Sequence, residues 1–97
     1  MKLLTKELER RFAEVGSQDK PDAVVVAKFF TPWSNWTWYA TAYDPEERMF
    51  FGLVQGLETE LGYFSLDELE SLKGPVGLKI ERDLYWRETT IDKVGRR

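Results

Sequence analysis

The stretch from Trp36 to Tyr43 constrains the fold more than any other part of the chain. Two sets of side chains alternate along it, Trp36, Trp38, Ala40 and Ala42 in one set and Thr37, Tyr39, Thr41 and Tyr43 in the other. A period of two places successive side chains on opposite faces of an extended chain. The stretch therefore predicts a β-strand with one buried face and one half-exposed face.

Further strand-like segments lie on both sides of this one. Residues 23–30 carry a β-branched run, residues 48–55 are apolar on both faces around Gly52, which marks a bulge or a close approach, and residues 59–64 predict a fourth strand. An extended segment is also expected just after Gly77. Short polar connections, such as the turn at 44–47, favour antiparallel neighbours. The segments therefore predict a meander-like antiparallel sheet.

Helical patterns precede and follow these strands. Residues 3–15 have an apolar stripe at three- and four-residue spacing, with Thr5 as a candidate N-cap. Ser65 and Glu68 form a capping box ahead of a short helix at 66–72, and a final turn is expected at 91–94, before a frayed basic end at 96–97. We expect a single α+β domain over residues 1–97, with four to five short strands and the first two helices packed on one face.

The composition excludes the commonest catalytic and metal-binding groups. The chain of 97 residues has no cysteine and no histidine. It therefore has no thiolate nucleophile, no imidazole base and neither of the usual zinc ligands. We expect a protein that is not an enzyme and holds no cofactor or metal ion.

Charge and hydropathy limit the classes of partner. The formal net charge is −3, and lysine and arginine are scattered, so direct binding to nucleic acid has no electrostatic driver. The sequence contains no apolar run of about 20 residues for a membrane span and no apolar segment typical of an export signal near its start. We expect a cytoplasmic protein that meets nucleic acid only through a partner complex.

Aromatic side chains are the strongest candidates for a binding surface. Eleven of the 14 aromatic residues fall between Phe29 and Phe64. Tyrosine and tryptophan are enriched at protein interfaces, and they equally fill the cores of small sheets. The candidate partner-binding residues in this group are Trp33, Trp36, Tyr39 and Tyr43.

Charged side chains add three candidates to this partner-binding set. Glu58 and Glu60 lie two apart and are expected to project from one side of an extended strand. Three roles fit this position: binding a cation, acting as an acid and base pair, or protecting a sheet edge. Arg82 lies between Glu81 and Asp83 and binds a carboxylate or phosphate, or holds an internal ion pair.

Several longer motifs resemble a known family. They are Lys28-Phe29-Phe30-Thr31-Pro32, Ser34-Asn35-Trp36-Thr37-Trp38-Tyr39-Ala40-Thr41, Phe51-Gly52-Leu53-Val54, Glu58-Thr59-Glu60-Leu61-Gly62-Tyr63-Phe64-Ser65-Leu66 and Ile80-Glu81-Arg82-Asp83-Leu84. Together they make nearly the whole chain similar to domain-of-unknown-function family 2958. This resemblance implies the setting of a bacterial plasmid or integrative element, and it implies no activity.

These observations lead to one functional expectation and two alternatives. The first is a non-enzymatic accessory protein of a mobile genetic element that binds a partner protein through its aromatic surface. A narrower alternative is an inhibitor of a host defence complex, such as a restriction or CRISPR effector. The alternative from another class is a metal-dependent enzyme that uses the carboxylates of Glu58, Glu60 or Asp83.

Overall fold

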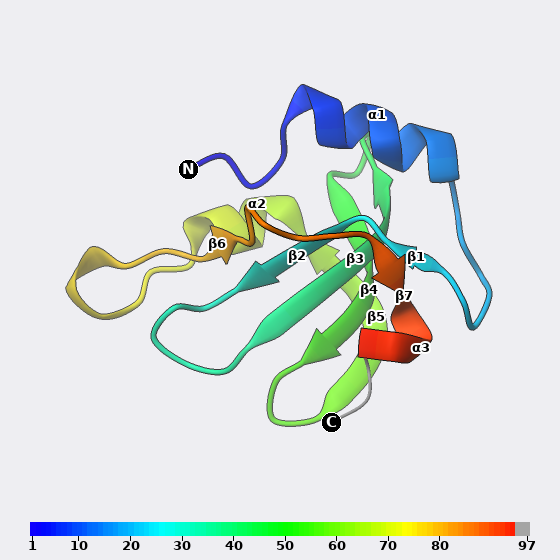
Figure 1. Cartoon of the computed structure of the whole chain (residues 1–97). Coiled ribbons are helices and arrows are strands. Elements are labelled where there is room, and N and C mark those ends of the chain that lie inside the picture. Colours follow the sequence, from blue (N-terminus) through cyan, green and yellow to red (C-terminus); the bar gives the residue numbers. More distant parts are fainter. Residues whose placement is uncertain (95–97) are drawn as a thin grey trace.

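An antiparallel five-stranded sheet organises the computed structural model, which describes residues 1–94 (Figure 1). The sheet has the order β5-β4-β3-β2-β6, and β1 and β7 form a second, two-stranded antiparallel sheet. The strands are β1 (Val24–Val25), β2 (Ala27–Phe30), β3 (Thr37–Asp44), β4 (Met49–Gln55), β5 (Thr59–Ser65), β6 (Glu81–Arg82) and β7 (Thr89–Thr90). The helices are α1 (Lys6–Val15), α2 (Leu66–Ser71) and α3 (Ile91–Val94), with a 3-10 turn η1 (Pro75–Gly77). The predicted α+β class and antiparallel meander are confirmed.

The predicted N-cap bonds of the first two helices are present. The Leu8 amide donates to the Thr5 hydroxyl, and the Glu68 amide donates to the Ser65 hydroxyl at 3.1 Å. The first helix begins at Lys6, after its cap, and not at residue 3. The basic end predicted at residues 96–97 lies outside the described residues.

The segment predicted as one strand at 23–30 is two strands in different sheets. β1 pairs with β7, whereas β2 pairs with β3 and β6. The chain leaves one sheet for the other at Val26, whose amide donates to the Ala40 carbonyl at 2.9 Å. In the extended segment expected after Gly77, Lys79 forms an isolated antiparallel bridge with Lys73, and Glu81 and Arg82 form the short strand β6.

The core lies between the sheet and the first two helices, and Phe50 is its centre. Phe50 is fully buried, and its ring contacts those of Phe12, Phe29, Tyr43 and Phe64 at centroid distances of 5.7, 5.2, 4.9 and 5.4 Å. Buried leucines of α2 and Ile80 extend the same cluster. The face of the sheet that carries Phe50 is called the helical face below.

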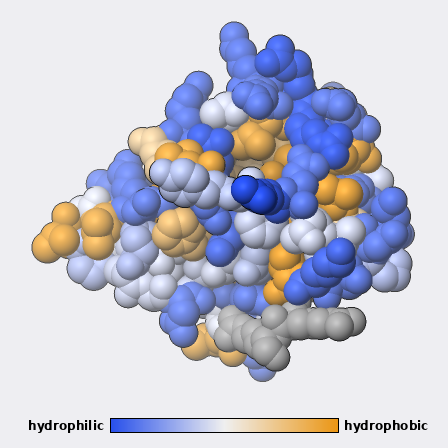
Figure 2. Space-filling view, in the orientation of Figure 1, coloured by the Kyte–Doolittle hydropathy of each residue, from blue (hydrophilic) through white to orange (hydrophobic). Residues whose placement is uncertain are grey.

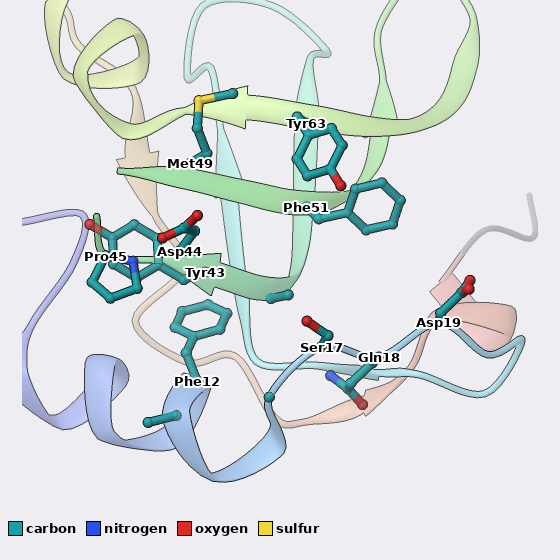
Figure 3. A pocket seen from close by; sticks show the side chains of 13 residues that line it. Phe12, Ser17, Gln18, Asp19, Tyr43, Asp44, Pro45, Met49, Phe51 and Tyr63 are labelled. Atoms are coloured by element: carbon teal, nitrogen blue, oxygen red, sulfur yellow. The ribbon is translucent and has the colours of Figure 1, made fainter. Parts of the chain in front are cut away.

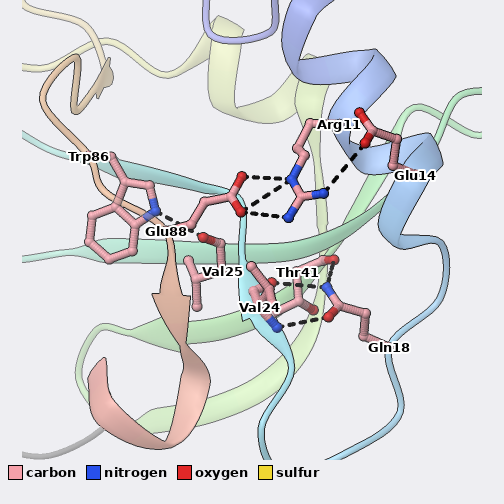
Figure 4. A network of polar contacts seen from close by, with 8 residues as sticks. All are labelled: Arg11, Glu14, Gln18, Val24, Val25, Thr41, Trp86 and Glu88. Atoms are coloured by element: carbon pink, nitrogen blue, oxygen red, sulfur yellow. Dashed lines mark hydrogen bonds and ion pairs between the residues drawn. The ribbon is translucent and has the colours of Figure 1, made fainter.

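The opposite face, called the outer face below, is partly covered by the C-terminal segment (Figure 1). The Trp86 indole donates to the Val25 carbonyl at 2.9 Å and its ring lies 5.8 Å from that of Tyr39. The Ile91 amide donates to the Ala23 carbonyl, and Arg11 forms a bidentate ion pair with Glu88 (Figure 4). These contacts hold the C-terminal segment against α1, β1 and β3, which lie far away in the sequence.

A β-bulge in β3 changes which face its last residues occupy. Ala40 pairs with Gly52 and Ala42 pairs with Phe51, so Thr41 is the extra residue. At the bulge the backbones of β3 and β4 come so close that only glycine fits at position 52. A Cβ on Gly52 would lie 1.8 Å from the Tyr39 carbonyl oxygen. After the bulge Tyr43 lies on the helical face, opposite Phe50, and Ala42 lies on the outer face. The prediction that Tyr43 shares a face with Tyr39 is therefore wrong.

Among the described residues, no strand pairs with this side of β3 after the bulge, because β2 pairs only with residues 37–40. Gln18 occupies that place (Figure 4). Its Nε2 donates to the carbonyls of Val24 and Thr41 at 2.9 and 2.7 Å, and its Oε1 accepts from the Val24 amide at 2.8 Å. One side chain thus satisfies backbone groups of two strands.

Exposed apolar side chains gather in a few places. Figure 2 shows them in separate groups among polar ones, including a tip formed by the loop that carries η1. Val76 in that loop is 97% exposed and has a φ of 49°, a left-handed conformation that β-branched residues rarely adopt. Within residues 1–94 no helix combines the length and the apolar character that crossing a bilayer requires.

Candidate functional site

An exposed apolar surface lies on the outer face where β4 meets β5. It consists of Met49, Phe51, Leu61 and Tyr63, and we call it the Tyr63 patch. Leu61 is 62% exposed and Tyr63 is 75% exposed, and the Phe51 and Tyr63 rings meet edge to face at 4.9 Å. Exposed aromatic side chains that are held by a rigid neighbour are typical of protein-binding surfaces.

A pocket of about 650 Å³ opens beside the Tyr63 patch (Figure 3). Phe51, Tyr63 and Met49 line one side of it, and the loop at residues 17–19 lines the other. Phe12 and Tyr43 reach it from the core. The exposed residues Asp19 and Asp44 also line the pocket, which therefore combines aromatic rings with acidic side chains.

The Tyr63 patch borders an edge of the sheet with which no further strand of residues 1–94 pairs. β5 pairs with β4 and occupies the end of the strand order. Two hydrogen bonds fix the direction of its backbone groups, from the Gly56 amide to the Glu58 carbonyl and from the Leu66 amide to the Arg48 carbonyl. Since backbone groups alternate along an antiparallel strand, those of even-numbered residues face β4 and those of Leu61 and Tyr63 face away from the sheet.

A smaller hollow of about 350 Å³ lies at the other end of β5. Its lining includes Trp36, Glu58 and Glu60, so the structure brings together three of the predicted partner-binding residues. Trp36 is 38% exposed, packs 5.9 Å from the Trp38 ring and lies against Gly56, where a Cβ would come within 2.3 Å of the Trp36 ring. Trp36 is therefore held in place at the surface beside two carboxylates.

The other predicted aromatic residues lie elsewhere and are half-buried. Trp33 packs against the core cluster, with its ring over Gly74. Tyr39 lies on the outer face beneath Trp86, with the Lys28 ammonium 6.0 Å from its ring. The four aromatic candidates thus do not form one continuous surface.

Arg82 and Tyr43 also lie apart from the hollow beside Trp36. The Nε of Arg82 is buried and makes no hydrogen bond within residues 1–94, while Asp83 faces the Lys28 ammonium at 4.0 Å. Burial raises the pKa of the Tyr43 hydroxyl above its ordinary value, and the nearby Arg48 guanidinium opposes this effect. Tyr43 therefore belongs mainly to the core, although its ring reaches the pocket.

The charged residues in β5 and directly beside it in the sequence are acidic. Residues 56–72 include five acids and neither lysine nor arginine. The nearest base in the adjacent turn, Arg48, donates to Asp67 at 2.8 Å and to Glu70 at 3.3 Å. The hydrogen bond to Asp67 and its charge raise the pKa of Arg48. Among the described residues, no group of three or more acidic side chains is arranged to hold a metal ion.

Sequence reasoning did not select Phe51, Leu61 or Tyr63 as binding residues. The signal was present in the alternation of Leu61 and Tyr63 within the predicted fourth strand, which places both on one face. The missing information was what covers the outer face, because the C-terminal segment lies over Tyr39 and leaves Leu61 and Tyr63 exposed.

Comparison with known proteins places the chain in a family. No curated protein and no solved structure matches it. The family model described as "Protein of unknown function (DUF2958)" matches residues 2–92. The chain therefore belongs to this family, as its motifs indicated.

Proposed function

We propose that this chain is a non-catalytic protein-binding domain and that its binding surface is the Tyr63 patch together with the free edge of β5. The observation that carries the proposal is the exposure of Leu61 and Tyr63 on a strand whose own backbone groups also face away from the sheet. Apolar side chains and unpaired strand groups at one edge offer both contact area and hydrogen bonds to a partner.

The proposed surface differs from the predicted one in its centre. Tyr39 and Tyr43 are partly covered by Trp86 and the core, so they offer less surface than Tyr63. Trp36, Glu58 and Glu60 remain in the proposal, because they flank the same strand at its beginning. The proposed binding surface therefore includes both sides of the β5 edge, with Glu60 of the hollow on the helical face and the Tyr63 patch on the outer face.

Affinity capture from a bacterial lysate tests the proposal. The bait is the folded chain, compared with the double variant Leu61→Ser and Tyr63→Ser. The matched control is Leu84→Ser with Tyr85→Ser, which changes the same residue types at positions 60% and 91% exposed. We expect the control to keep its partners and the patch variant to lose them. Equal capture by both folded variants would exclude the Tyr63 patch as the binding surface.

We also propose a biological setting for this binding. The resemblance to proteins of plasmids and integrative elements supports a host protein as the partner, and a restriction or CRISPR effector is the candidate. Expression of the chain should then increase plasmid or phage entry into a strain that carries the matching defence, and the Leu61 and Tyr63 double variant should not. If plasmid and phage entry is unchanged across several defence types, the defence complex is excluded as the partner. The affinity-capture experiment then still tests the binding surface.

A further inference from the structure

The two edges of the five-stranded sheet are unequal. β6 forms one edge with two residues, and its Arg82 amide donates to the Met1 sulfur at 3.2 Å. β5 forms the other edge with seven residues. It contains no proline and no bulge in its pairing with β4, which are two common devices that block strand addition. The backbone of β5 is therefore well suited to accept another strand.

The two faces of β5 differ in chemistry. On the outer face, Leu61 and Tyr63 offer apolar contact area. On the helical face, Glu60 pairs across with Val54, and Gly62 has no atom within 4 Å of the place where a Cβ would be. A strand added beside β5 would thus meet apolar groups on one face, and a carboxylate with open space next to it on the other.

Charge decides between a second copy of the chain and a different partner. The segment from Glu58 to Glu70 has five exposed acids and neither lysine nor arginine, and the guanidinium of Arg48 in the adjacent turn already pairs with two of these acids. Two copies paired through β5 would bring these acidic segments together, and like charges facing each other across strands are destabilising. Basic side chains in the same place would gain favourable interactions.

We propose that β5 accepts an extended segment of a partner protein as a sixth strand, and that this segment alternates apolar and basic residues. Its apolar side chains lie beside Leu61 and Tyr63. Its lysine or arginine side chains cross the open space at Gly62 to reach Glu60. The inference rests on the proposed protein-binding function and names the chemistry of the partner.

Binding of a synthetic peptide tests the mode directly. The probe is a nine-residue peptide of alternating valine and lysine, titrated calorimetrically into the full chain at low salt. The comparison peptides are a scrambled sequence of the same composition and one that alternates valine and glutamate. We expect the alternating lysine peptide to bind about tenfold or more tightly than the scrambled one. A ratio of this size is what one correctly placed lysine–glutamate contact contributes to the affinity. The glutamate peptide should not bind.

Variants of the chain separate the backbone from the charge. Leu61→Pro removes an amide that faces away from β4, whereas Leu61→Thr changes the same side chain and keeps the amide. We expect the proline variant to lose binding and the threonine variant to keep most of it, because proline is tolerated on an edge strand but cannot donate there. Glu60→Lys should also abolish binding, whereas Glu7→Lys, an exposed charge reversal on α1, should not. Glu60→Lys keeps the test decisive if the proline variant does not fold.

The outcomes distinguish this inference from the proposed function. Failure of the lysine peptide to bind, or binding unchanged by Leu61→Pro and Glu60→Lys, would overturn strand addition. Dimerisation of the free chain in sedimentation experiments, abolished by Leu61→Pro, would also overturn it in favour of a second copy. If the Leu61 and Tyr63 double variant still loses its lysate partner in any of these cases, the protein-binding function stands without this mode.

Discussion

Replacing Gln18 with alanine should destabilise the fold although Gln18 lies in a loop. The half-buried Gln18 side chain makes three hydrogen bonds to the backbone of Val24 and Thr41, at 2.7 to 2.9 Å. It links β1 to the side of β3 with which β2 does not pair, next to the bulge that turns Tyr43 into the core. Without it, one amide and two carbonyl groups lose their partner.

The size of the effect follows from these bonds. Each contributes about 0.5 to 1.5 kcal/mol net to folding. Water can reach part of this half-buried site and offset some of the loss, so we expect a decrease of about 2 kcal/mol in the free energy of unfolding. For a domain of this size that corresponds to a fall in the melting temperature of about 8 to 16 °C.

Urea denaturation followed by tryptophan fluorescence and circular dichroism measures the change. Gln18→Glu is informative, because it keeps an acceptor for the Val24 amide and places a carboxylate against two carbonyl oxygens, so it should be at least as unstable as Gln18→Ala. Asp19→Ala is the matched control, since Asp19 is the exposed neighbour in the same loop. A Gln18→Ala variant as stable as Asp19→Ala would refute the role assigned to this side chain.

Three further predictions concern the core, the surface and pH. Phe50→Ala should lower the free energy of unfolding by about 3 to 5 kcal/mol, because it empties the centre of the aromatic core, and a loss below 1 kcal/mol in the same assay would contradict that position. Val76→Gly should raise the free energy of unfolding by about 0.5 to 1 kcal/mol, because glycine adopts the left-handed conformation without strain and this gain exceeds the extra entropy of glycine in the unfolded chain. A loss of stability would contradict the strain at Val76. Burial raises the pKa of Tyr43 in the folded state above its ordinary value of about 10. The stability that the protonated Tyr43 hydroxyl contributes is therefore complete below about pH 10 and is lost as the pH rises through the raised pKa. Melting temperatures measured from pH 8 to 12 should therefore fall less for Tyr43→Phe than for the unmodified chain or for Tyr85→Phe, and identical profiles would refute this.

The elements of the fold could be predicted because their signals are local. The capping box at Ser65 and the alternation along β3 need only neighbouring residues, and both predict elements that the structure contains. Gly52 indicated a bulge or a close approach, which the structure confirms, but the alternation along β3 did not place the extra residue at Thr41, whose carbonyl accepts from Gln18 in a distant loop. One inserted residue then moved Tyr43 from the predicted surface into the core.

The candidate site was predicted only in part for a related reason. Trp36, Glu58 and Glu60 meet because they flank one hairpin, so their proximity follows from sequence positions. Exposure depends on what covers each face, and the C-terminal segment that covers Tyr39 is about 50 residues away in the sequence. The same segment leaves Leu61 and Tyr63 largely exposed.

Amide hydrogen exchange along β5, with and without the valine-lysine peptide, tests the central claim most directly. In the free chain, the amides of Leu61 and Tyr63 face away from the sheet and should exchange fast, whereas those of Gly62 and Phe64 face β4 and should exchange slowly. Added peptide should slow exchange at Leu61 and Tyr63, because their amides then donate to a sixth strand. A peptide that binds while both amides still exchange fast would contradict the account.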